Sequence, residues 1–447
     1  MMNCIIGLDI GTSAVKGVIM SEDGSVLMTK QEKFTYFGEE NQHLINAEDY
    51  CNKCFSVIKQ LADFVKGTHT VSAICSCCAS GNLLLLDDQD MPLIPIIGWQ
   101  TTVTEEEGDR FFTKEEQNSI YETVGWPFIL QFPEVCLAAI KEYRSDLLEK
   151  AKTVTMSGEY LNFKLTGKWG LSYSAGTPFY LINQAKGEYD SALLNKLGIA
   201  DKFLPPLYDK GTVLGTLTKQ MAEELGLSED TKVVLGSFDH PSGALGAGVF
   251  EQGQMLLSCG TSWVELFPVP SREFALATNG LVDRFMLKGE PYCAMKSLTS
   301  VNVKIEALRR HYFGNIELRE FDALAIQGEP GCKGLKFDFT DSDLTKGEGF
   351  EKKEIARAII EAAANLLKDN LDELKECGLK AEKITAIGGI TNSAECVEII
   401  SQVLGIEITV VNGQSAGAVG ACLLGGVGVG IFEDEKSAFN IMYNAKK

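Results

Sequence analysis

Residues 3–20 read Asn-Cys-Ile-Ile-Gly-Leu-Asp-Ile-Gly-Thr-Ser-Ala-Val-Lys-Gly-Val-Ile-Met, which is an apolar strand ending at one acid, a tight turn and a second apolar strand. Gly11 lets the backbone approach a bulky anion, and the amides and hydroxyls of Thr12 and Ser13 can cradle phosphate oxygens. Asp9 would be costly as a bare charge at a buried strand end, and a bound Mg²⁺ would remove that cost. The alternative is an ordinary hairpin whose acid caps its own turn.

A near-copy of this hairpin lies about 250 residues further on. Residues 254–267 read Gln-Met-Leu-Leu-Ser-Cys-Gly-Thr-Ser-Trp-Val-Glu-Leu-Phe, so a strand again enters a Gly-Thr-Ser turn, at Gly260, Thr261 and Ser262. Two such hairpins, one in each half, indicate an internal duplication, and two facing turns would hold a polyphosphate from both sides. The second hairpin has no acid where Asp9 sits, so only the first is suited to a metal.

Two further segments join a strand to a small-residue turn or helix. Residues 236–248 read Gly-Ser-Phe-Asp-His-Pro-Ser-Gly-Ala-Leu-Gly-Ala-Gly, with Asp239 after an apolar strand. Local sequence alone favours a helix N-cap for this acid. Residues 386–393 read Ala-Ile-Gly-Gly-Ile-Thr-Asn-Ser, where Gly388 and Gly389 would let the backbone approach a nucleotide or simply make a strand-to-helix turn.

The ordered set of these motifs resembles the FGGY carbohydrate kinases, within the sugar kinase, heat-shock chaperone and actin superfamily. The resemblance runs along most of the 447 residues. It implies an α/β protein with two actin-like ATPase (ribonuclease-H-like) domains and an active-site cleft between them. We expect an N-terminal, sugar-binding domain over residues 1–248 and a C-terminal, nucleotide-binding domain over residues 249–447.

The resemblance also implies roles for single residues. Asp239 matches the family's catalytic acid and is the expected general base, which does not exclude a capping role as well. Asp9 and Asp239 are expected to handle Mg²⁺, with Lys16 either nearby or simply solvated at its strand end. Phosphate and nucleotide contacts are expected from the two turns and the adenosine motif: Gly11, Thr12, Ser13, Gly260, Thr261, Ser262, Gly388, Gly389, Asn392 and Ser393.

The sugar side of the site departs from the family pattern. The segment around Trp99 looks like the family's Trp-centred substrate segment, and an indole face suits the C–H side of a polyol. Many relatives continue with an acid and an arginine, whereas Thr101 and Thr102 follow here. The family's Gly-Glu-Arg-x-Pro loop is absent. The substrate-binding residues expected from the resemblance are Ser80, Gly81, Trp99, Gln100 and Asp239. For His240, which the resemblance does not support as an acid or base, we expect either a contact with the sugar or a structural role.

Composition narrows the functional class. The formal net charge of −20 argues against a general nucleic-acid binder, which needs a basic face, and against docking on anionic lipid. No run of 18 apolar residues and no signal segment are visible, so we expect a cytoplasmic protein without a membrane partner. Thirteen cysteines, an odd number, fit reduced thiols. The clusters Cys51-x-x-Cys54 and Cys75-x-Cys77-Cys78 are expected in the core rather than on a metal.

The rest of the chain alternates strands and helices. Apolar spacing predicts long helices over residues 49–66 and 353–376, and single helices over 104–120 and 133–150. Residues 416–432, rich in glycine, predict a tightly packed helix and turn.

These observations predict an enzyme that uses ATP and Mg²⁺ to phosphorylate a hydroxyl of a small sugar or polyol, such as a pentulose or deoxy-hexulose. Two alternatives stay open at this point: a phosphotransferase or ATPase acting on another acceptor with the same scaffold, and a non-catalytic nucleotide-dependent switch. The expected partner is the small-molecule substrate, with a homodimer left open.

Overall fold

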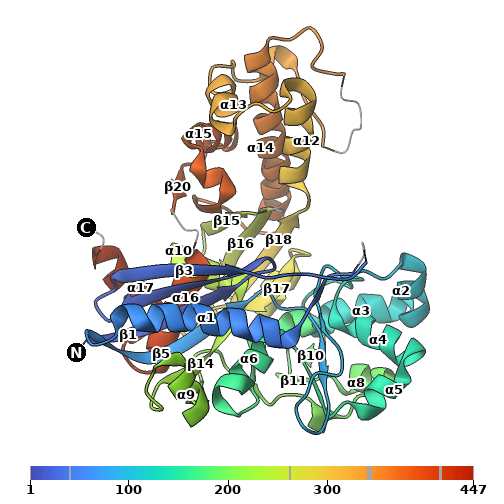
Figure 1. Ribbon diagram of the computed structural model, residues 1–447. Coiled ribbons are helices and arrows are strands. Elements are labelled where there is room, and N and C mark those ends of the chain that lie inside the picture. The colour runs from blue at the N-terminus through green and yellow to red at the C-terminus, as the bar shows by residue number, and fades with distance from the viewer. Residues whose placement is uncertain (1, 40–41, 261–262, 340–344, 412–414, 446–447) are drawn as a thin grey trace. The chain divides into compact units, whose positions relative to one another are not determined.

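The computed structural model describes residues 2–39, 42–260, 263–339, 345–411 and 415–445 (Figure 1). Contacts between residues divide the chain into two compact units. The first unit comprises Met1–Gly248, Leu281–Pro291 and Ser415–Lys447, and the second comprises Val249–Gly280 and Tyr292–Gln414. Residues 281–291 and 415–447 thus belong to the first unit by contact, although they follow residue 249 in the sequence. The division into a sugar-binding and a nucleotide-binding domain at 248/249 stays a prediction.

The first unit is built on a six-stranded sheet with strand order β13-β14-β5-β1-β2-β3. Strands β1, β2 and β3 form antiparallel pairs, whereas β5 and β14 run parallel to β1. The sheet strands are β1 (Met2–Ile10), β2 (Ala14–Ser21), β3 (Val26–Lys33), β5 (His69–Cys78), β13 (Val213–Thr216) and β14 (Lys232–Phe238). Because β1, β5 and β14 are parallel, their carboxyl ends meet at one edge of the sheet.

Both faces of this sheet are covered by apolar side chains. In β1, Ile6 and Leu8 belong to one buried cluster with helix α1 (Ala47–Val65). Ile5 belongs to a second cluster with helix α16 (Ala416–Gly428). The alternation follows from the two-residue period of a strand. Burial on both faces explains why the strand reads as a continuous hydrophobic run.

Helices and short strands surround the sheet. The helices of the first unit are α1 (Ala47–Val65), α2 (Glu105–Phe111), α3 (Lys114–Val124), α4 (Pro133–Tyr143), α5 (Ser145–Lys150), α6 (Ser157–Thr166), α7 (Tyr173–Gly176), α8 (Ser191–Leu197), α9 (Lys219–Leu225), α10 (Asp239–Ala247), α16 (Ala416–Gly428) and α17 (Glu435–Ala445). The short strands are β4 (Leu44–Ile45), β6 (Leu84–Leu86), β7 (Ile96–Ile97), β8 (Thr153–Thr155), β9 (Leu171–Ser172), β10 (Ile182–Asn183), β11 (Glu188–Tyr189), β12 (Leu207–Tyr208) and β17 (Leu281–Arg284).

Glycines bring α16 into direct contact with β1 and α10. A Cβ atom on Gly7 would lie 2.0 Å from the carbonyl oxygen of Ala418, and one on Gly420 would lie 1.9 Å from that of Ser242. A Cβ atom on Gly246 would lie 2.0 Å from the oxygen of Ala416. The small residues of α10 therefore serve packing between backbones, and the tight helix predicted after residue 416 is confirmed.

The second unit contains a sheet in which β18, β16, β15, β19 and β20 follow one another. Strands β15 and β16 form an antiparallel hairpin, and β19 pairs in parallel with both β15 and β20. Its elements are β15 (Gln254–Cys259), β16 (Trp263–Val269), β18 (Tyr292–Leu298), β19 (Lys383–Gly388), β20 (Ile408–Val410), α11 (Arg272–Leu276), α12 (Val301–Phe313), α13 (Leu318–Ala325), α14 (Lys352–Glu376) and α15 (Ala394–Leu404).

The long helices were predicted within two residues, but two shorter predictions were wrong. Residues 104–120 form two helices, α2 and α3, because Thr104 and Thr113 each begin a capping box. Residues 133–150 also divide, at Arg144, whose φ of −141° is not helical. All thirteen cysteines lie in the described part of the chain as reduced thiols, and the two clusters at Cys51–Cys54 and Cys75–Cys78 are buried, which confirms their predicted place in the core.

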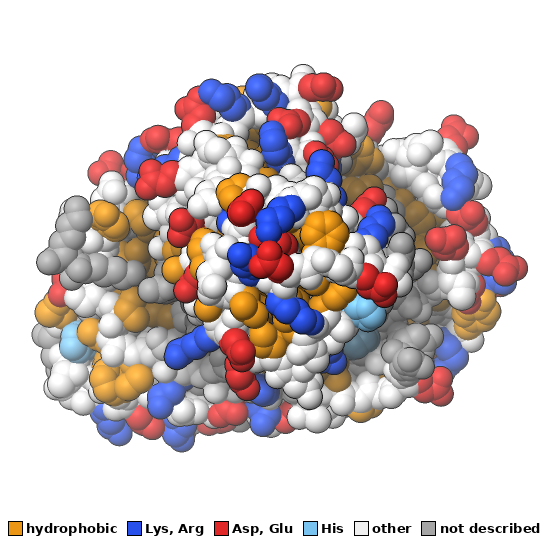
Figure 2. Space-filling model, turned by 90° about the horizontal axis from the view of Figure 1, so that it is seen from above, with side chains coloured by type: hydrophobic (Ala, Val, Ile, Leu, Met, Phe, Trp, Pro, Cys, Tyr) orange, Lys and Arg blue, Asp and Glu red, His pale blue; other side chains and the backbone are white. Residues whose placement is uncertain are grey.

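Two observations bear on the surface. No helix in the described part of the chain is long and apolar enough to cross a membrane. On the face shown in Figure 2, acidic and basic side chains are interspersed rather than gathered by sign.

Candidate active site

Asp9 lies near the carboxyl end of β1 and faces Lys16 across the β1–β2 pair. Its carboxylate is partly exposed, and the start of α16 comes close to it, since a Cβ atom on Gly417 would lie 2.8 Å from the carboxyl group. Burial and repulsion by Asp239 raise the pKa of Asp9 to about 6, against the opposing effects of Lys16 and Cys77. The acid thus sits where a cation would be stabilised.

Asp239 reaches the same edge of the sheet at the end of β14. It is the first residue of α10, so Phe238 rather than Asp239 occupies the N-cap position. The carboxylate Oδ1 accepts a hydrogen bond from the backbone N–H of His240 at 2.7 Å. Burial raises the pKa of Asp239, while His240 and nearby amides oppose that rise. The structure therefore corrects the N-cap interpretation. As a whole residue Asp239 is partly exposed, and it is near enough to Asp9 for the two charges to repel each other.

The first Gly-Thr-Ser turn is held by aromatic side chains. The turn is closed by a hydrogen bond from Gly11 N–H to the carbonyl of Ala14, at 3.0 Å. The indole Nε1–H of Trp99 donates to Thr12 Oγ1 at 3.0 Å, and the hydroxyl of Tyr36 donates to the Thr12 carbonyl. Trp99 therefore fixes the predicted phosphate turn directly. No sequence signal pointed to Tyr36.

A small cavity opens beside this turn. Every residue that lines it is uncharged: Ile10, Gly11, Thr12, Tyr36, Ile45, Tyr50, Ala79, Asn82, Ile96, Gly98, Trp99 and Ser157. The cavity joins the phosphate turn to the segment predicted to hold the sugar.

The other predicted substrate residues are not among those that line this cavity. Ser80 is buried, and its hydroxyl bonds to the carbonyl of Cys78. Gly81 has a φ of +85°, and a Cβ atom there would lie 2.4 Å from the ring of Phe132, so glycine is required. Gln100 is half-buried. The imidazole of His240 packs edge-on against the ring of Phe238, 5.4 Å away between centroids.

The hydroxyl of Thr101, two residues after Trp99, has a structural partner. Thr101 Oγ1 accepts a hydrogen bond from the backbone N–H of His43 at 3.0 Å. The side chain therefore ties the Trp99 segment to a neighbouring strand end.

In the second unit, the described part of the second Gly-Thr-Ser turn is anchored by Asn302. The Asn302 amide donates to the Gly260 carbonyl, and its Oδ1 accepts from the indole Nε1–H of Trp263 at 3.1 Å. Thr261 and Ser262, the other two predicted phosphate residues here, lie outside the described residues. Sequence reasoning missed Asn302, which is about 40 residues from the turn.

The predicted adenosine motif forms the end of β19 and the turn after it. Gly388 has a φ of +97°, and a Cβ atom there would lie 2.4 Å from the carbonyl oxygen of Cys259, so glycine is required for β19 to pair with β15. Gly389 and Asn392 bound a short 3₁₀ turn. Ser393 caps α15, accepting from Cys396 N–H at 3.1 Å.

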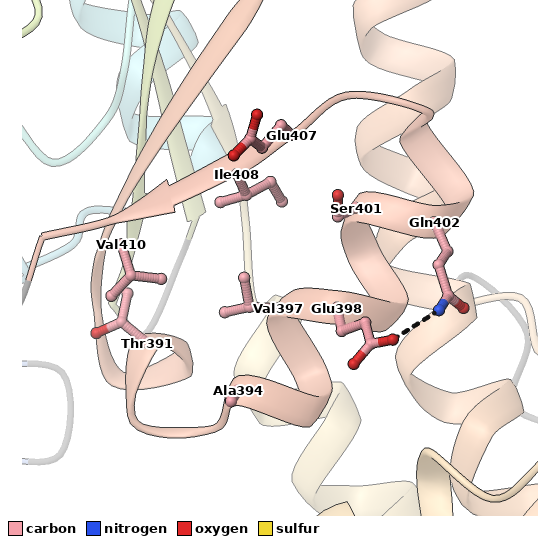
Figure 3. Close-up of a pocket in the computed structure, with 9 residues that line it drawn as sticks. All are labelled: Thr391, Ala394, Val397, Glu398, Ser401, Gln402, Glu407, Ile408 and Val410. Atoms are coloured by element: carbon pink, nitrogen blue, oxygen red, sulfur yellow. Dashed lines mark hydrogen bonds between the residues drawn. The ribbon is translucent and has the colours of Figure 1, made fainter.

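A cavity of about 480 Å³ lies between this turn, α15 and β20 (Figure 3). It is lined by Thr391, Ala394, Val397, Glu398, Ser401, Gln402, Glu407, Ile408 and Val410. Two carboxylates face it, and Glu398 accepts a hydrogen bond from Gln402 at 3.1 Å. The acidic lining disfavours a polyphosphate in this cavity.

Comparison with known proteins decides the family. Residues 4–246 match the N-terminal domain of the FGGY family of carbohydrate kinases, and residues 329–429 match its C-terminal domain. The chain belongs to the FGGY family of carbohydrate kinases. This confirms the resemblance drawn from the motifs and makes the protein a carbohydrate kinase.

Individual relatives span nearly all of this FGGY kinase. The chain is 25% identical to the xylulose kinase of Bacillus subtilis (strain 168), covering 97% of this chain and 89% of that one. It is 23% identical to the autoinducer-2 kinase of Klebsiella pneumoniae, covering 98% and 88%. The solved structure of ligand-bound xylulose kinase from Lactobacillus acidophilus matches with a TM-score of 0.89 at 20% identity, covering 98% of this chain and 92% of that one. The expected two-domain, actin-like fold is therefore confirmed.

Proposed function

We propose that this FGGY kinase transfers the γ-phosphoryl group of ATP to a hydroxyl of a pentulose, a deoxy-hexulose or a similar small polyol, with Asp239 as general base. The observation that carries the proposal is the convergence of Asp9 and Asp239, both partly exposed, where the parallel strands β1, β5 and β14 end. Phosphoryl transfer needs positioning and charge neutralisation more than covalent chemistry, and the paired carboxylates are suited to that task.

In the proposed reaction Asp239 accepts the proton of the acceptor hydroxyl, while the oxygen of that hydroxyl forms a bond to the γ-phosphorus. The bond from the γ-phosphorus to the bridging oxygen breaks, and ADP leaves with that electron pair. The raised pKa of Asp239 suits this role, because a base is most effective when its pKa lies nearer the working pH. Thr12 and Ser13 would hold phosphate oxygens at the first turn.

The site fits Mg²⁺. Asp9 and Asp239 would hold the ion, because a hard cation relieves the repulsion between two neighbouring carboxylates. Mg²⁺ keeps several waters and often uses one or two carboxylates, so no larger ligand cluster is needed. When bound, the ion would neutralise phosphate charge.

The substrate class is inferred from the uncharged residues that surround Trp99, since the cavity of about 20 Å³ between them has room for only about one water molecule. A sugar acid would need a cationic partner when its carboxylate is removed from water, whereas every residue that lines the cavity beside Trp99 is uncharged. This favours a neutral ketose or polyol. The relatives in Bacillus subtilis and Klebsiella pneumoniae are a xylulose kinase and an autoinducer-2 kinase, which is consistent with a small acceptor.

The test measures ADP release with ketoses, aldoses, polyols and sugar acids, and without any acceptor. We expect turnover that depends on a neutral ketose or polyol. Asp239→Asn should keep its fold and ATP binding while losing about 10²- to 10⁴-fold in kcat, and Asp230→Asn, at an exposed acid, is the matched control. Acceptor-independent hydrolysis would indicate an ATPase, and binding without turnover would indicate a switch. Full activity of D239N would exclude Asp239 as the base.

A further inference from the structure

The backbone that carries Asp239 leaves its sheet ladder just before the acid. Strand β14 pairs with β5 in regular register as far as Leu235 opposite Ser76, and the register then shifts before Phe238 opposite Cys78. A strand end without a regular ladder needs other partners for its amide and carbonyl groups. The position of Asp239 therefore depends on what replaces the ladder.

Two buried serines around the start of α7 supply those partners. Ser172 Oγ donates to the carbonyl of Gly236 at 2.7 Å, and the N–H of Phe238 donates to Ser174 Oγ at 3.2 Å. Ser172 and Ser174 are each 1% exposed, so water does not compete for these bonds. They hold the backbone on both sides of Ser237.

The hydroxyl of Ser174 is itself oriented by Asp283. An amide N–H can only donate, so Ser174 Oγ uses a lone pair for Phe238 and its proton is left for Asp283 Oδ2, at 3.0 Å. Asp283 is fully buried. Its Oδ1 accepts from Arg284 N–H at 2.7 Å and from Thr177 Oγ1 at 3.0 Å, so the carboxyl group is fixed from its other side.

Val282, the neighbour of Asp283, is linked to Phe238 through Trp126. The carbonyl of Val282 accepts hydrogen bonds from Trp126 Nε1–H at 3.2 Å and from Gln184 Nε2 at 2.9 Å. The ring of Trp126 packs edge-on against the ring of Phe238, with centroids 5.4 Å apart. Residues 282–283 of β17 thus control both the amide and the ring of the residue before Asp239.

We propose that Ser174 and Asp283 are positioning residues for Asp239, fixing the Phe238 amide and so the direction in which β14 presents the carboxylate. This inference rests on the proposed function, since it assigns the pair to the base that the proposed function names. Misplacement of a catalytic group by about 1 Å can cost on the order of 100-fold in rate. Removing the Ser174 hydroxyl should therefore reduce kcat more than substrate binding.

The experiment compares Ser174→Ala with Thr177→Val. Each variant removes one hydroxyl that donates to Asp283, but only S174A removes the acceptor of the Phe238 N–H. We expect S174A to lower kcat by about 10- to 100-fold, with the KM values for ATP and acceptor within about twofold. T177V should lower Tm to a similar degree and leave kcat within about twofold. Ser174→Thr, which restores a hydroxyl, should recover most of the activity.

A double-mutant cycle separates this inference from the proposed function. In an Asp239→Asn background, S174A should add no further loss of kcat, because the group it positions is already disabled. Independent, multiplicative losses would overturn the inference while leaving Asp239 as the base. Wild-type activity of D239N alone would instead overturn the proposed function. Equal loss of kcat in S174A and T177V would also refute the inference.

If S174A does not fold, Asp283→Asn carries the same test. Its Oδ1 can still accept from Thr177 and Arg284, while an amide group facing Ser174 no longer accepts the hydroxyl proton. We expect kcat to fall about 3- to 30-fold at unchanged KM values. An unchanged kcat in folded D283N would exclude Asp283 as a positioning residue.

Discussion

The two strand–turn–strand hairpins, β1–β2 and β15–β16, share a Gly-Thr-Ser turn but place their acids differently. In the first, Asp9 lies two residues before the glycine and Lys16 five residues after it. In the second, Ser258 occupies the place of Asp9, and Glu265 occupies the place of Lys16. Asp9 is partly exposed beside Asp239, whereas Glu265 is fully buried against α14 and accepts a hydrogen bond from Asn370.

This difference separates chemistry from architecture. An acid at the open end of a strand can meet a ligand, while an acid inside the packing only affects stability. The duplication therefore supplies one fold element twice, and substitutions at two positions decide which copy is suited to a metal.

The largest expected effect comes from Asp9→Asn. Loss of this carboxylate should reduce kcat by about 100-fold or more, since a clamp on transferred phosphate charge is worth several kcal/mol, and should raise the Mg²⁺ concentration needed for half-maximal rate. Ser258→Ala, at the matching place in β15, should stay within about twofold of wild type. A Mg²⁺ titration of ADP release checks both. Unchanged Mg²⁺ dependence in D9N would remove the metal role from the first hairpin.

Substituting the turn glycine should mainly lower stability at Gly388 and mainly impair the use of ATP at Gly11. Gly388→Ala should destabilise the protein by about 2–4 kcal/mol, because the residue has a positive φ and its Cβ would lie 2.4 Å from the Cys259 carbonyl. Gly11→Ala meets nothing closer than 3.7 Å, so it should cost less than about 1 kcal/mol while impairing ATP use. Denaturant unfolding and KM for ATP measure these effects. A larger unfolding cost for G11A than for G388A would contradict the comparison.

Glu265→Gln tests the buried acid through pH. Burial raises the pKa of Glu265 to about 7, against the opposing effects of Asn370 and Lys296. The folded protein then holds a proton that the unfolded chain releases near its ordinary pKa of about 4.3, so stability falls as pH rises from about 4 to 7. E265Q should remove this slope and be more stable than wild type by about 1–3 kcal/mol at pH 8.

Thermal unfolding from pH 5 to pH 8 measures the slope for wild type and variants. Glu376→Gln, at an exposed acid at the end of α14 that does not act on Glu265, is the control and should keep the wild-type slope. Parallel slopes for wild type and E265Q would show that Glu265 titrates normally.

The smallest effects concern the two tryptophans beside the turns. Trp99→Phe removes the hydrogen bond to Thr12, worth about 1 kcal/mol, and should reduce kcat/KM about fivefold with little change in Tm. Trp263→Phe removes the bond to Asn302 from a fully buried ring and should act mainly on Tm. The comparison fails if W99F changes only stability, or if W263F changes acceptor KM while Tm is constant.

Sequence reasoning predicted the elements whose signal is local. The strands around both turns and the helix over residues 353–376 follow from apolar periodicity, and Gly388 was placed at a turn that requires glycine. The helices over 104–120 and 133–150 were wrong because internal capping at Thr113 and a non-helical Arg144 interrupt the apolar spacing. The family was recognisable because four separate short motifs occur in order.

The remaining site features depend on distant partners and have no local signal. Asp283 is buried because Ser174 and Thr177, more than 100 residues earlier, donate to it. Tyr36 and Asn302 bond to turns far from them in sequence. Placement of Asp239 at the first position of its helix, instead of the cap, also depended on how β14 leaves the sheet.

The return of residues 281–291 and 415–447 to the first unit has a practical consequence. Expression as fragments divided after residue 248 would separate β1 from the glycine-rich helix that covers it and would strip Asp283 from its serine partner. The chain crosses from one unit to the other at residues 248/249, 280/281, 291/292 and 414/415. Dissection of this enzyme therefore calls for a circularly permuted or co-expressed design, with tethers placed at those crossings.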